Sequence, residues 1–268
     1  MKIFSFNING IRAHLHQLKL IIKIYNPDII GLQEIKVNNK NFPKEEIYKL
    51  GYNFCICGQA QYNGVAILSK KKFCNIKKEF LNNYDNQKRL IMVDLNSSIG
   101  NIKIINGYFP QGGNKYNYVK FKYKIDFLKN LYSFIKRKLK PNNHIIIIGD
   151  INISITDLDI GIGNKNRQKW LKQGICSFLP EERFYINKLL NWGLFDIWRL
   201  MNPFTSNKFS WFDYRSNKFS LNKGLRIDNI LITKSLIKYY INSNIEYNIR
   251  NLIKPSDHAP IWVNLKII

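Results

Sequence analysis

The chain has 268 residues, of which 45% are hydrophobic and 22% charged, so it can form an apolar core and is not intrinsically disordered. Its longest apolar runs, such as Ile145–Ile148, fall far short of the roughly 20 residues that a membrane-spanning helix needs. The N-terminus turns polar at once and lacks the apolar core of a secretory signal peptide. Lysine and arginine outnumber aspartate and glutamate by 42 to 18, and this net charge of +24 favours a polyanionic partner, nucleic acid first.

The positive charge also has a compositional explanation. Of the 42 basic residues 33 are lysine, and the chain is rich in Ile, Asn, Lys, Tyr and Phe, whose codons are AT-rich, so base-composition drift alone could supply much of the lysine. Cysteines occur only at Cys55, Cys57, Cys74 and Cys176, too few and too scattered for a disulfide scaffold, and no second Cys/His pair completes a zinc site. We therefore expect reduced thiols in a cytosolic protein.

The first half of the chain predicts strands around one amphipathic helix. Apolar residues recur at spacings of three and four from Leu15 to Tyr25, and Pro27 ends this helix. The strands expected here are Lys2–Ile8, Asp28–Gln33, Phe54–Cys57, Gly64–Ser69, Leu90–Leu95 and Ile102–Tyr108.

The second half predicts a long helix, a buried strand and a mixed remainder. The helix covers Phe121–Leu139 and is closed by Pro141, and the all-apolar run His144–Ile148 is typical of a strand buried on both faces. A further helix is expected near Glu181–Leu190. The remaining strands are expected at Phe209–Asp213, Ile227–Ile232 and Ile261–Leu265.

The order of these elements predicts the fold class. Helices fall between strand pairs and do not follow every strand, which argues against a regular Rossmann or barrel order. Two mixed sheets packed on each other, with helices outside, fit the α/β pattern better. No linker or low-complexity stretch divides the chain, so we expect one domain over residues 1–268.

Polar side chains gather at the ends of the expected strands, where sites in α/β proteins form. Carboxylates there can hold a hard cation or deprotonate a water, and amide and phenol groups can bind phosphoryl oxygens. The candidates are Asn7, Glu34, Tyr108, Asp150, Asn152, Asp228, Asp257 and His258.

Each candidate also has a structural explanation. Glu34 could pair with a nearby lysine at a solvated strand end, and Asn152 could form an Asx turn with a capping role. Asp228 lies within an apolar strand, where a charge is costly unless it is paired, either with His258 or with Arg226. A pair with His258 would fix the imidazole tautomer and raise the pKa of the histidine.

The aromatic run Phe209–Asp213 ends close to Arg215. Aromatic side chains beside an arginine can stack on or wedge into nucleic acid. A core strand is the structural alternative, at least for alternate residues of the run.

Taken together, these motifs resemble the exonuclease III branch of the bacterial AP endonucleases, within the endonuclease/exonuclease/phosphatase superfamily. The resemblance covers essentially the whole chain. It is carried by Phe4–Gly10, Ile30–Glu34, the loop at Tyr108, Gly149–Ser154, Thr156–Gly163, Ser177–Arg183, Ser210–Ser216, Gly224–Asp228 and Lys254–Pro260.

This resemblance implies a four-layer α/β sandwich and a Mg²⁺-dependent phosphodiesterase, with Mn²⁺ as a possible substitute. Such enzymes cut the DNA backbone 5′ to abasic sites, degrade duplex DNA from its 3′ ends and remove blocking groups there. The implied partner is double-stranded DNA with abasic sites or 3′ ends. No membrane and no obligate protein partner are implied, and the enzyme would be a cytoplasmic monomer associated with the nucleoid through DNA.

The resemblance also assigns roles at matching positions. The implied catalytic residues are Tyr108, Asp150, Asn152, Asp228 and His258. The implied metal-site residues are Asn7, Glu34, Asp150, Asn152 and Asp257. The implied substrate-binding residues are Arg89 on the phosphates and Trp211, Phe212 and Leu225 around a flipped-out baseless sugar.

Two other classes of protein stay open from the sequence. A related hydrolase could use the same site on RNA or on a phosphorylated small molecule. A non-catalytic DNA-binding relative would be expected to have lost at least one of Glu34, Asp150, Asp228 and His258, and all four are present.

Overall fold

The first of two sheets brings the two ends of the chain together. Its strand order is β11-β12-β1-β2-β4-β3, in which β1 and β2 are parallel and the other neighbours are antiparallel. Its strands are β1 (Lys2–Asn7), β2 (Ile29–Gln33), β3 (Asn53–Cys57), β4 (Val65–Ser69), β11 (Tyr240–Ile245) and β12 (Ile261–Leu265). The protein is described by a computed structural model that covers residues 1–78, 81 and 87–268.

The second sheet has the order β5-β6-β7-β8-β10-β9, with β7 and β8 parallel and the other neighbours antiparallel. Its strands are β5 (Asn75–Lys78), β6 (Leu90–Ser97), β7 (Gly100–Tyr108), β8 (His144–Asp150), β9 (Leu194–Asp196) and β10 (Asp228–Thr233). Both sheets are therefore mixed, as the sequence predicts.

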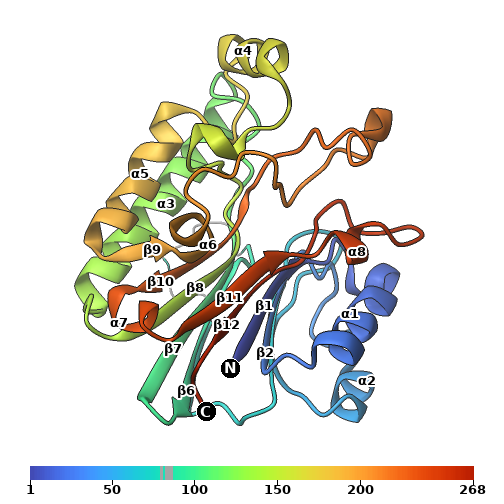
Figure 1. Ribbon diagram of the computed structural model, residues 1–268, viewed down its shortest axis with the longest axis vertical. Coiled ribbons are helices and arrows are strands. Elements are labelled where there is room, and N and C mark those ends of the chain that lie inside the picture. The colour runs from blue at the N-terminus through green and yellow to red at the C-terminus, as the bar shows by residue number, and fades with distance from the viewer. Residues whose placement is uncertain (79–80, 82–86) are drawn as a thin grey trace.

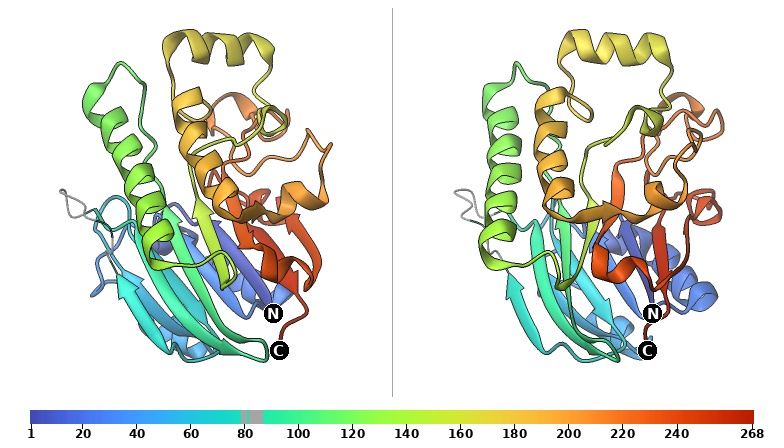
Figure 2. Two further views of the ribbon diagram at one scale, coloured as in Figure 1. Left: turned by 90° about the vertical axis from the view of Figure 1, so that its left-hand side faces the viewer. Right: turned by 60° about the vertical axis from the view of Figure 1, so that its left-hand side comes forward.

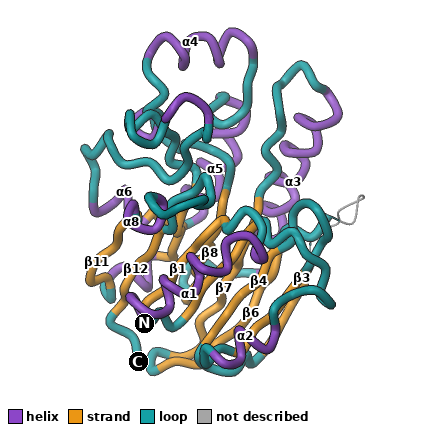
Figure 3. The backbone as a smooth tube through the Cα atoms, turned by 90° about the vertical axis from the view of Figure 1, so that its right-hand side faces the viewer, coloured by secondary structure: helices purple, strands orange, loops and turns teal. Residues whose placement is uncertain are grey.

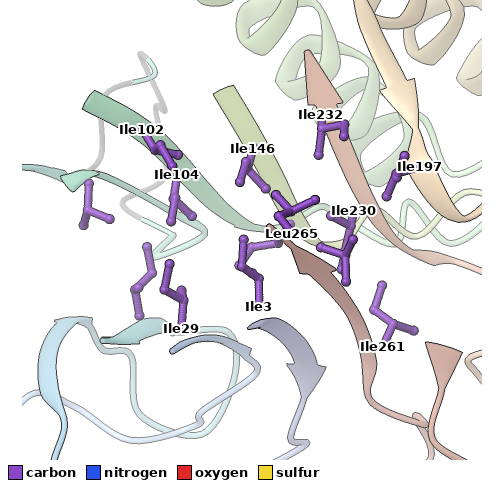
Figure 4. Close-up of a cluster of buried hydrophobic side chains, with 14 of the residues drawn as sticks. Ile3, Ile29, Ile102, Ile104, Ile146, Ile197, Ile230, Ile232, Ile261 and Leu265 are labelled. Carbon is purple, nitrogen blue, oxygen red and sulfur yellow. The ribbon is translucent and has the colours of Figure 1, made fainter. Parts of the chain in front are cut away.

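A layer of branched aliphatic side chains lies between the sheets (Figure 4). Ile3 and Ile29 reach it from the first sheet, and Ile104 and Ile146 reach it from the second. On β8, Ile146 and Ile148 point into this layer, whereas Ile145 and Ile147 point to the opposite face. The prediction that this strand is buried on both faces is confirmed.

Helices cover the outer face of each sheet (Figures 1 and 2). On the first sheet, α1 (Ile11–Tyr25) packs its apolar face against β1 and β2, and α2 (Lys44–Lys49) lies beside it. On the second sheet, α3 (Tyr118–Lys138) and α5 (Pro180–Trp192) pack against β7 and β8. The order helix, sheet, sheet, helix confirms the predicted four-layer α/β sandwich.

One predicted strand is wrong. Residues Phe209–Asp213 form no strand, and only isolated bridges join Trp211 to Leu225 and to His258. The apolar run reflects packing instead, because Phe209 and Phe212 are both buried and make edge contacts with each other. A strand would have pointed the first and fourth residues of this run to opposite faces.

Several short elements carry no clear periodicity and were not expected from the sequence. These are α2, β5, β9, β11, α4 (Asn164–Gln173), α6 (Ile197–Met201), α7 (Lys234–Ile237), α8 (Tyr247–Arg250) and the 3₁₀ turns Asp157–Asp159 and Arg215–Asn217.

The two ends of the sandwich differ. Both termini lie at one end, and long loops gather at the other end, beyond the last residues of β1, β2, β7 and β8 (Figure 3). Within the described ranges, no helix has the length and apolar character needed to cross a bilayer.

Candidate active site

The ends of four strands bring the candidate residues together. β1 ends at Asn7, and Glu34 follows the parallel strand β2. In the second sheet β7 ends at Tyr108, and its parallel neighbour β8 ends at Asp150. Asp228 opens β10 directly opposite Asp150 in antiparallel register. The sheet topology thus delivers residues more than two hundred positions apart to one edge.

Asn7 joins the carboxylates of the two sheets. Its Nδ2 donates to Glu34 Oε1 and to Asp150 Oδ2, at 2.9 Å in each case. Its Oδ1 accepts from the backbone N–H of Asn9 at 3.1 Å. Asn7 is fully buried, so its amide has no freedom to turn away from these partners. The nitrogen, not the oxygen, of this amide faces the two carboxylates.

His258 reaches the same edge because β12 runs antiparallel to β1, which places the segment before β12 beside the end of β1. Its Nδ1 lies 2.8 Å from Asp228 Oδ2, and its Nε2 lies 3.8 Å from Asp150 Oδ2. Asp228 Oδ2 thus fixes the orientation of the ring, while Nε2 faces Asp150. Among the described residues, Asp228 Oδ1 has no hydrogen-bond partner.

Arg226, the other partner considered for Asp228, binds elsewhere. Its guanidinium makes buried ion pairs with Asp159 and Asp196, at 2.7 Å and 2.5 Å. These pairs anchor the loop before α4 against β9 and β10 and leave Asp228 to the histidine.

Burial and charge change the acidities of this cluster. Burial raises the pKa of Asp150 to about 7, with a further contribution from the charge of Asp228, although His258 and Asn7 act in the opposite direction. Burial disfavours the imidazolium form of His258, but the carboxylates of Asp228 and Asp150 outweigh it and raise the pKa to about 10. The site therefore favours an imidazolium at neutral pH and makes ionisation of Asp150 costly before a cation binds.

Glu34 behaves differently from Asp150. Burial favours its neutral form, but the charge of Lys36 and a hydrogen bond from Asn7 lower its pKa on balance. Lys36 Nζ lies 2.9 Å from Glu34 Oε2, so the surface pair considered from the sequence exists alongside the contact with Asn7. Glu34 is therefore charged at neutral pH.

Arg89 holds Tyr108 at the edge of the candidate site. The guanidinium lies 4.8 Å from the centre of the Tyr108 ring, and its NH1 group donates to Tyr108 O at 3.1 Å. Burial, with the charges of Glu34 and Asp150, raises the pKa of the phenol well above its ordinary value. Tyr108 is therefore a hydrogen-bond donor and not a phenolate. Arg89, predicted to grip phosphates, is 8% exposed and contacts Tyr108 in this structure.

Asn152 lies in a turn and not in an extended segment. Its φ is +53°, and its backbone N–H donates to Asp150 Oδ1 at 2.9 Å, which is an Asx turn. The turn brings its side-chain Nδ2 within 2.9 Å of Phe109 O and 3.3 Å of Asp150 Oδ2. Asn152 therefore forms an Asx turn and also lies beside the Asp150 carboxylate.

Asp257 lies one residue before the histidine but faces other partners. Its Oδ1 accepts from Asn9 Nδ2 at 2.8 Å and its Oδ2 from Trp211 Nε1 at 3.0 Å. Trp211 is half-buried, whereas Phe212 and Leu225, predicted to line the same pocket, are almost fully buried beneath the surface. Trp211 also lines a cavity of about 160 Å³ shared with α4 and the segment 213–223.

Glu34, Asp150 and His258 could hold a metal ion. Each offers one ligand atom, and these atoms lie within 4.8 Å of one another. Two carboxylate oxygens suit a small hard cation that keeps several waters, such as Mg²⁺. The same carboxylate oxygens suit Mn²⁺, and His258 can act as a ligand only if it loses its proton. The sequence placed the two carboxylates at a metal but gave His258 a catalytic role alone.

Two serines that orient this site were not found from the sequence. Ser256 Oγ donates to Asn7 O at 2.7 Å and accepts from the backbone N–H of His258 at 3.2 Å. Ser210 Oγ accepts from the backbone N–H of Asp228 at 3.0 Å. Ser256 stands within the Ser-Asp-His run, which is a usable signal, but Ser210 has none.

Comparison with known proteins identifies the family that builds this site. Residues 4–258 match the model of the Endonuclease/Exonuclease/phosphatase family. The chain belongs to this family. Over 267 residues it is 49% identical to the exodeoxyribonuclease III of Haemophilus influenzae, covering 99% of this chain and 100% of that one. This whole-length match places the chain in the exonuclease III branch of nucleases.

Solved structures of family members share the complete fold. An AP endonuclease from Archaeoglobus fulgidus matches with a TM-score of 0.89 and 29% identity over 99% of both chains. A 3′ phosphatase from Neisseria, bound to a product DNA hairpin, matches with a TM-score of 0.88 and 30% identity over 99% of both chains.

Proposed function

We propose that this chain is a DNA-repair phosphodiesterase that cuts the DNA backbone 5′ to abasic sites, using a divalent metal ion. We also propose 3′–5′ exonuclease activity and removal of blocking groups from 3′ ends of duplex DNA. One observation carries the proposal: the carboxylates of Glu34 and Asp150 and the imidazole of His258 come within 4.8 Å of one another, so a cation and a protonated histidine can face one phosphate group. Asp228 holds the histidine from behind at 2.8 Å.

Glu34 and Asp150 would hold Mg²⁺, with Mn²⁺ as a substitute. Asn7 keeps the two carboxylates together, and Asn152 and Asp257 would complete the surroundings of the ion. When bound, the ion supplies positive charge that neutralises the scissile phosphate and the departing oxygen. Ionisation of Asp150, whose pKa is raised to about 7, must accompany binding of the ion.

The side chains of the site would divide the hydrolysis among them. Asp150, once ionised, accepts a proton from the water that attacks phosphorus. His258 as an imidazolium donates a hydrogen bond through Nε2 to a phosphate oxygen, and Asp228 keeps the ring charged and oriented. Tyr108 and Asn152 donate to the phosphate as charge grows on its oxygens. The P–O3′ bond breaks, and the 3′ oxygen takes up a proton from solvent.

Recognition of damaged DNA would come from the surface beside this site. Trp211 would contact a baseless sugar, and Phe212 and Leu225 would form the floor beneath it. The family member from Neisseria binds a DNA hairpin, and a net charge of +24 favours a duplex. Arg89 would act on the phosphate through the Tyr108 loop that it supports.

The remaining expectations belong to the same proposal. Every group of the site comes from one chain, so we propose a monomer in which residues 1–268 form one catalytic domain. The four cysteines are all free thiols, which fits the cytoplasm, with association to the nucleoid through DNA.

A substrate panel tests this function against its alternatives. The protein is given a duplex with one abasic site, a duplex with a 3′-phosphate, an RNA duplex and a small aryl phosphodiester, each with Mg²⁺. We expect the two DNA duplexes to be processed at least about 100-fold faster than the other substrates. Contacts with DNA away from the scissile bond contribute binding energy that lowers the barrier to cleavage. Preference for RNA or for the small diester would overturn the proposal, and binding of DNA without any cleavage would indicate a non-catalytic relative.

A further inference from the structure

A buried ion pair lies behind the candidate site. Lys124 projects from the buried face of α3 and pairs with Glu182 in the first turn of α5. Both side chains have zero exposure, so neither charge can interact with solvent or with DNA. A buried pair of this kind costs several kcal/mol in desolvation and is often replaced by apolar residues without loss of stability. Its presence therefore calls for a reason other than stability.

The ammonium group of Lys124 connects three segments. One donor goes to Glu182, one to Asn152 O at 2.9 Å and one to Gln111 O at 3.2 Å. An ammonium has three donors, so its capacity is filled. Asn152 belongs to the turn after Asp150, and Gln111 belongs to the loop that begins at Tyr108. The two loops that carry the proposed phosphate-binding donors are thus tied to one fixed nitrogen.

The carboxylate of Glu182 is fixed as firmly as its partner. Its oxygens accept from the backbone N–H groups of Ser177 at 2.9 Å and Leu179 at 2.7 Å. Ser177 O in turn accepts at 2.6 Å from the backbone N–H of Ser154, which is two residues after Asn152. Rigid backbone contacts therefore hold Glu182, and Glu182 holds the ammonium.

The carbonyl of the turn at Asn152 is where the ammonium group of Lys124 acts. Asn152 has a φ of +53°, in the left-handed region that asparagine tolerates, and its carbonyl oxygen accepts from Lys124 Nζ. The carbonyl group of Asn152 sets the plane of the peptide bond that follows its Cα atom. That plane affects the direction of the Asn152 side chain, whose Nδ2 lies 3.3 Å from Asp150 Oδ2. Nearby, Gly112 packs so closely that an added Cβ would lie 2.7 Å from Lys124 Cδ. The lysine stem thus sets the path of the Tyr108 loop as well.

We propose that Lys124 is a positioning residue, clamped by Glu182, that holds the Asn152 turn and the Tyr108 loop in the geometry needed for phosphodiester cleavage. The inference rests on the proposed function, because it concerns the residues assigned to the phosphate. Lys124 touches no reacting atom and acts only through the two carbonyl groups that it binds.

The decisive experiment separates positioning from stability. K124M removes the ammonium but keeps an unbranched stem, and leaves the carboxylate of Glu182 buried without its partner. The double variant K124M/E182Q removes that charge while the glutamine oxygen still accepts from Leu179 N. We expect the double variant to regain melting temperature relative to K124M, because no unpaired charge remains buried. We expect its kcat to stay about 100-fold below wild type, with KM changed less than about threefold, as for a misplaced catalytic group.

Neighbouring residues provide matched controls. Lys122, two positions earlier on α3, and Glu181, next to Glu182, are both substantially exposed and form surface pairs. K122M and E181Q remove the same charges and should keep kcat within about twofold of wild type, because surface pairs contribute little.

Different results would overturn the positioning role of Lys124 and the proposed nuclease function. If K124M/E182Q is folded and its kcat lies within about threefold of wild type, the pair is only structural. Amide hydrogen exchange of the segment 150–155 gives a second readout that needs no catalysis, and equal exchange in wild type and double variant would also refute positioning. If wild-type protein cuts no DNA, the proposed function fails, and the exchange measurement alone decides whether Lys124 holds the turn.

Discussion

Replacing Asp150 with asparagine should stabilise the metal-free protein at pH 8 while abolishing cleavage. The carboxyl group is 1% exposed, and burial together with the charge of Asp228 raises its pKa from 3.8 to about 7. The unfolded chain therefore loses this proton first as pH rises. Folding stability falls between about pH 3.8 and pH 7 and stays low above that range.

The size of the effect follows from that pKa difference. One pKa unit corresponds to about 1.4 kcal/mol, so ionising Asp150 in the folded state costs up to about 4 kcal/mol at pH 8. The attraction of His258 is already contained in that pKa, but the Nδ2 group of asparagine cannot accept the hydrogen bonds that Asn7 and Asn152 donate, which leaves an expected gain of about 1–3 kcal/mol. At pH 5 the wild-type carboxyl is protonated in the folded state, and the gain should shrink to less than half.

Urea unfolding in EDTA at pH 8 and pH 5 measures both values. D126N, which changes an exposed carboxylate on α3, is the control and should shift stability by less than about 0.5 kcal/mol. Equal effects of D150N at the two pH values, or a loss of stability at pH 8, would refute the argument that ionisation of this buried carboxyl group destabilises the folded protein. Mg²⁺ should stabilise the wild type and leave D150N nearly unchanged.

Three further outcomes follow from the same site and its surroundings. D228N should lower the pKa of His258 from about 10 by at least about two units, which NMR of the imidazole measures. It should also reduce kcat about 100-fold or more. An unchanged pKa of His258 would contradict its pairing with Asp228. The apparent Kd for Mg²⁺, from calorimetry, should rise about tenfold per pH unit below pH 7 because Asp150 must lose a proton, and a flat profile would contradict this. R226M leaves Asp159 without its main partner and should cost about 3–5 kcal/mol in urea unfolding, whereas a loss below about 1 kcal/mol would show that the buried network is dispensable.

The strand framework was predictable because its signal is local. The four isoleucines of β8 alternate between the layer that joins the sheets and the layer that faces the helices. A strand buried on both faces can be recognised from the sequence as a continuous apolar run. The order of the elements then limited the architecture to layered sheets. Phe209–Asp213 was misread because aromatic content indicates burial without indicating direction, and the segment buries Phe209 and Phe212 in an irregular loop.

The candidate site was predictable as a set of positions but not as a geometry. Polar residues at strand ends identified Glu34, Asp150 and the pair Asp228–His258. The sequence could not show that Arg89 lies against Tyr108, because that contact depends on the antiparallel register of β6 and β7, which places Arg89 opposite Tyr108. Such pairings become visible only when the long-range partners are in place.

The buried side chain of Lys124 gives a signal in the sequence that helical periodicity alone does not explain. Lys124 falls three residues before Phe127 and four before Leu128, on the apolar face of the expected helix. A charge at such a position is costly unless a partner meets it. Its partner Glu182 is 58 positions away, and no local pattern connects the two.

Incision of a duplex that carries one abasic site, with Mg²⁺ and then with excess EDTA, tests the central claim most directly. The account predicts a cut on the 5′ side of the lesion that leaves a 3′-hydroxyl, that disappears in EDTA and that returns when Mg²⁺ is restored. Folded protein that binds the metal and the duplex but leaves the strand intact, or cuts equally well in EDTA, would contradict it.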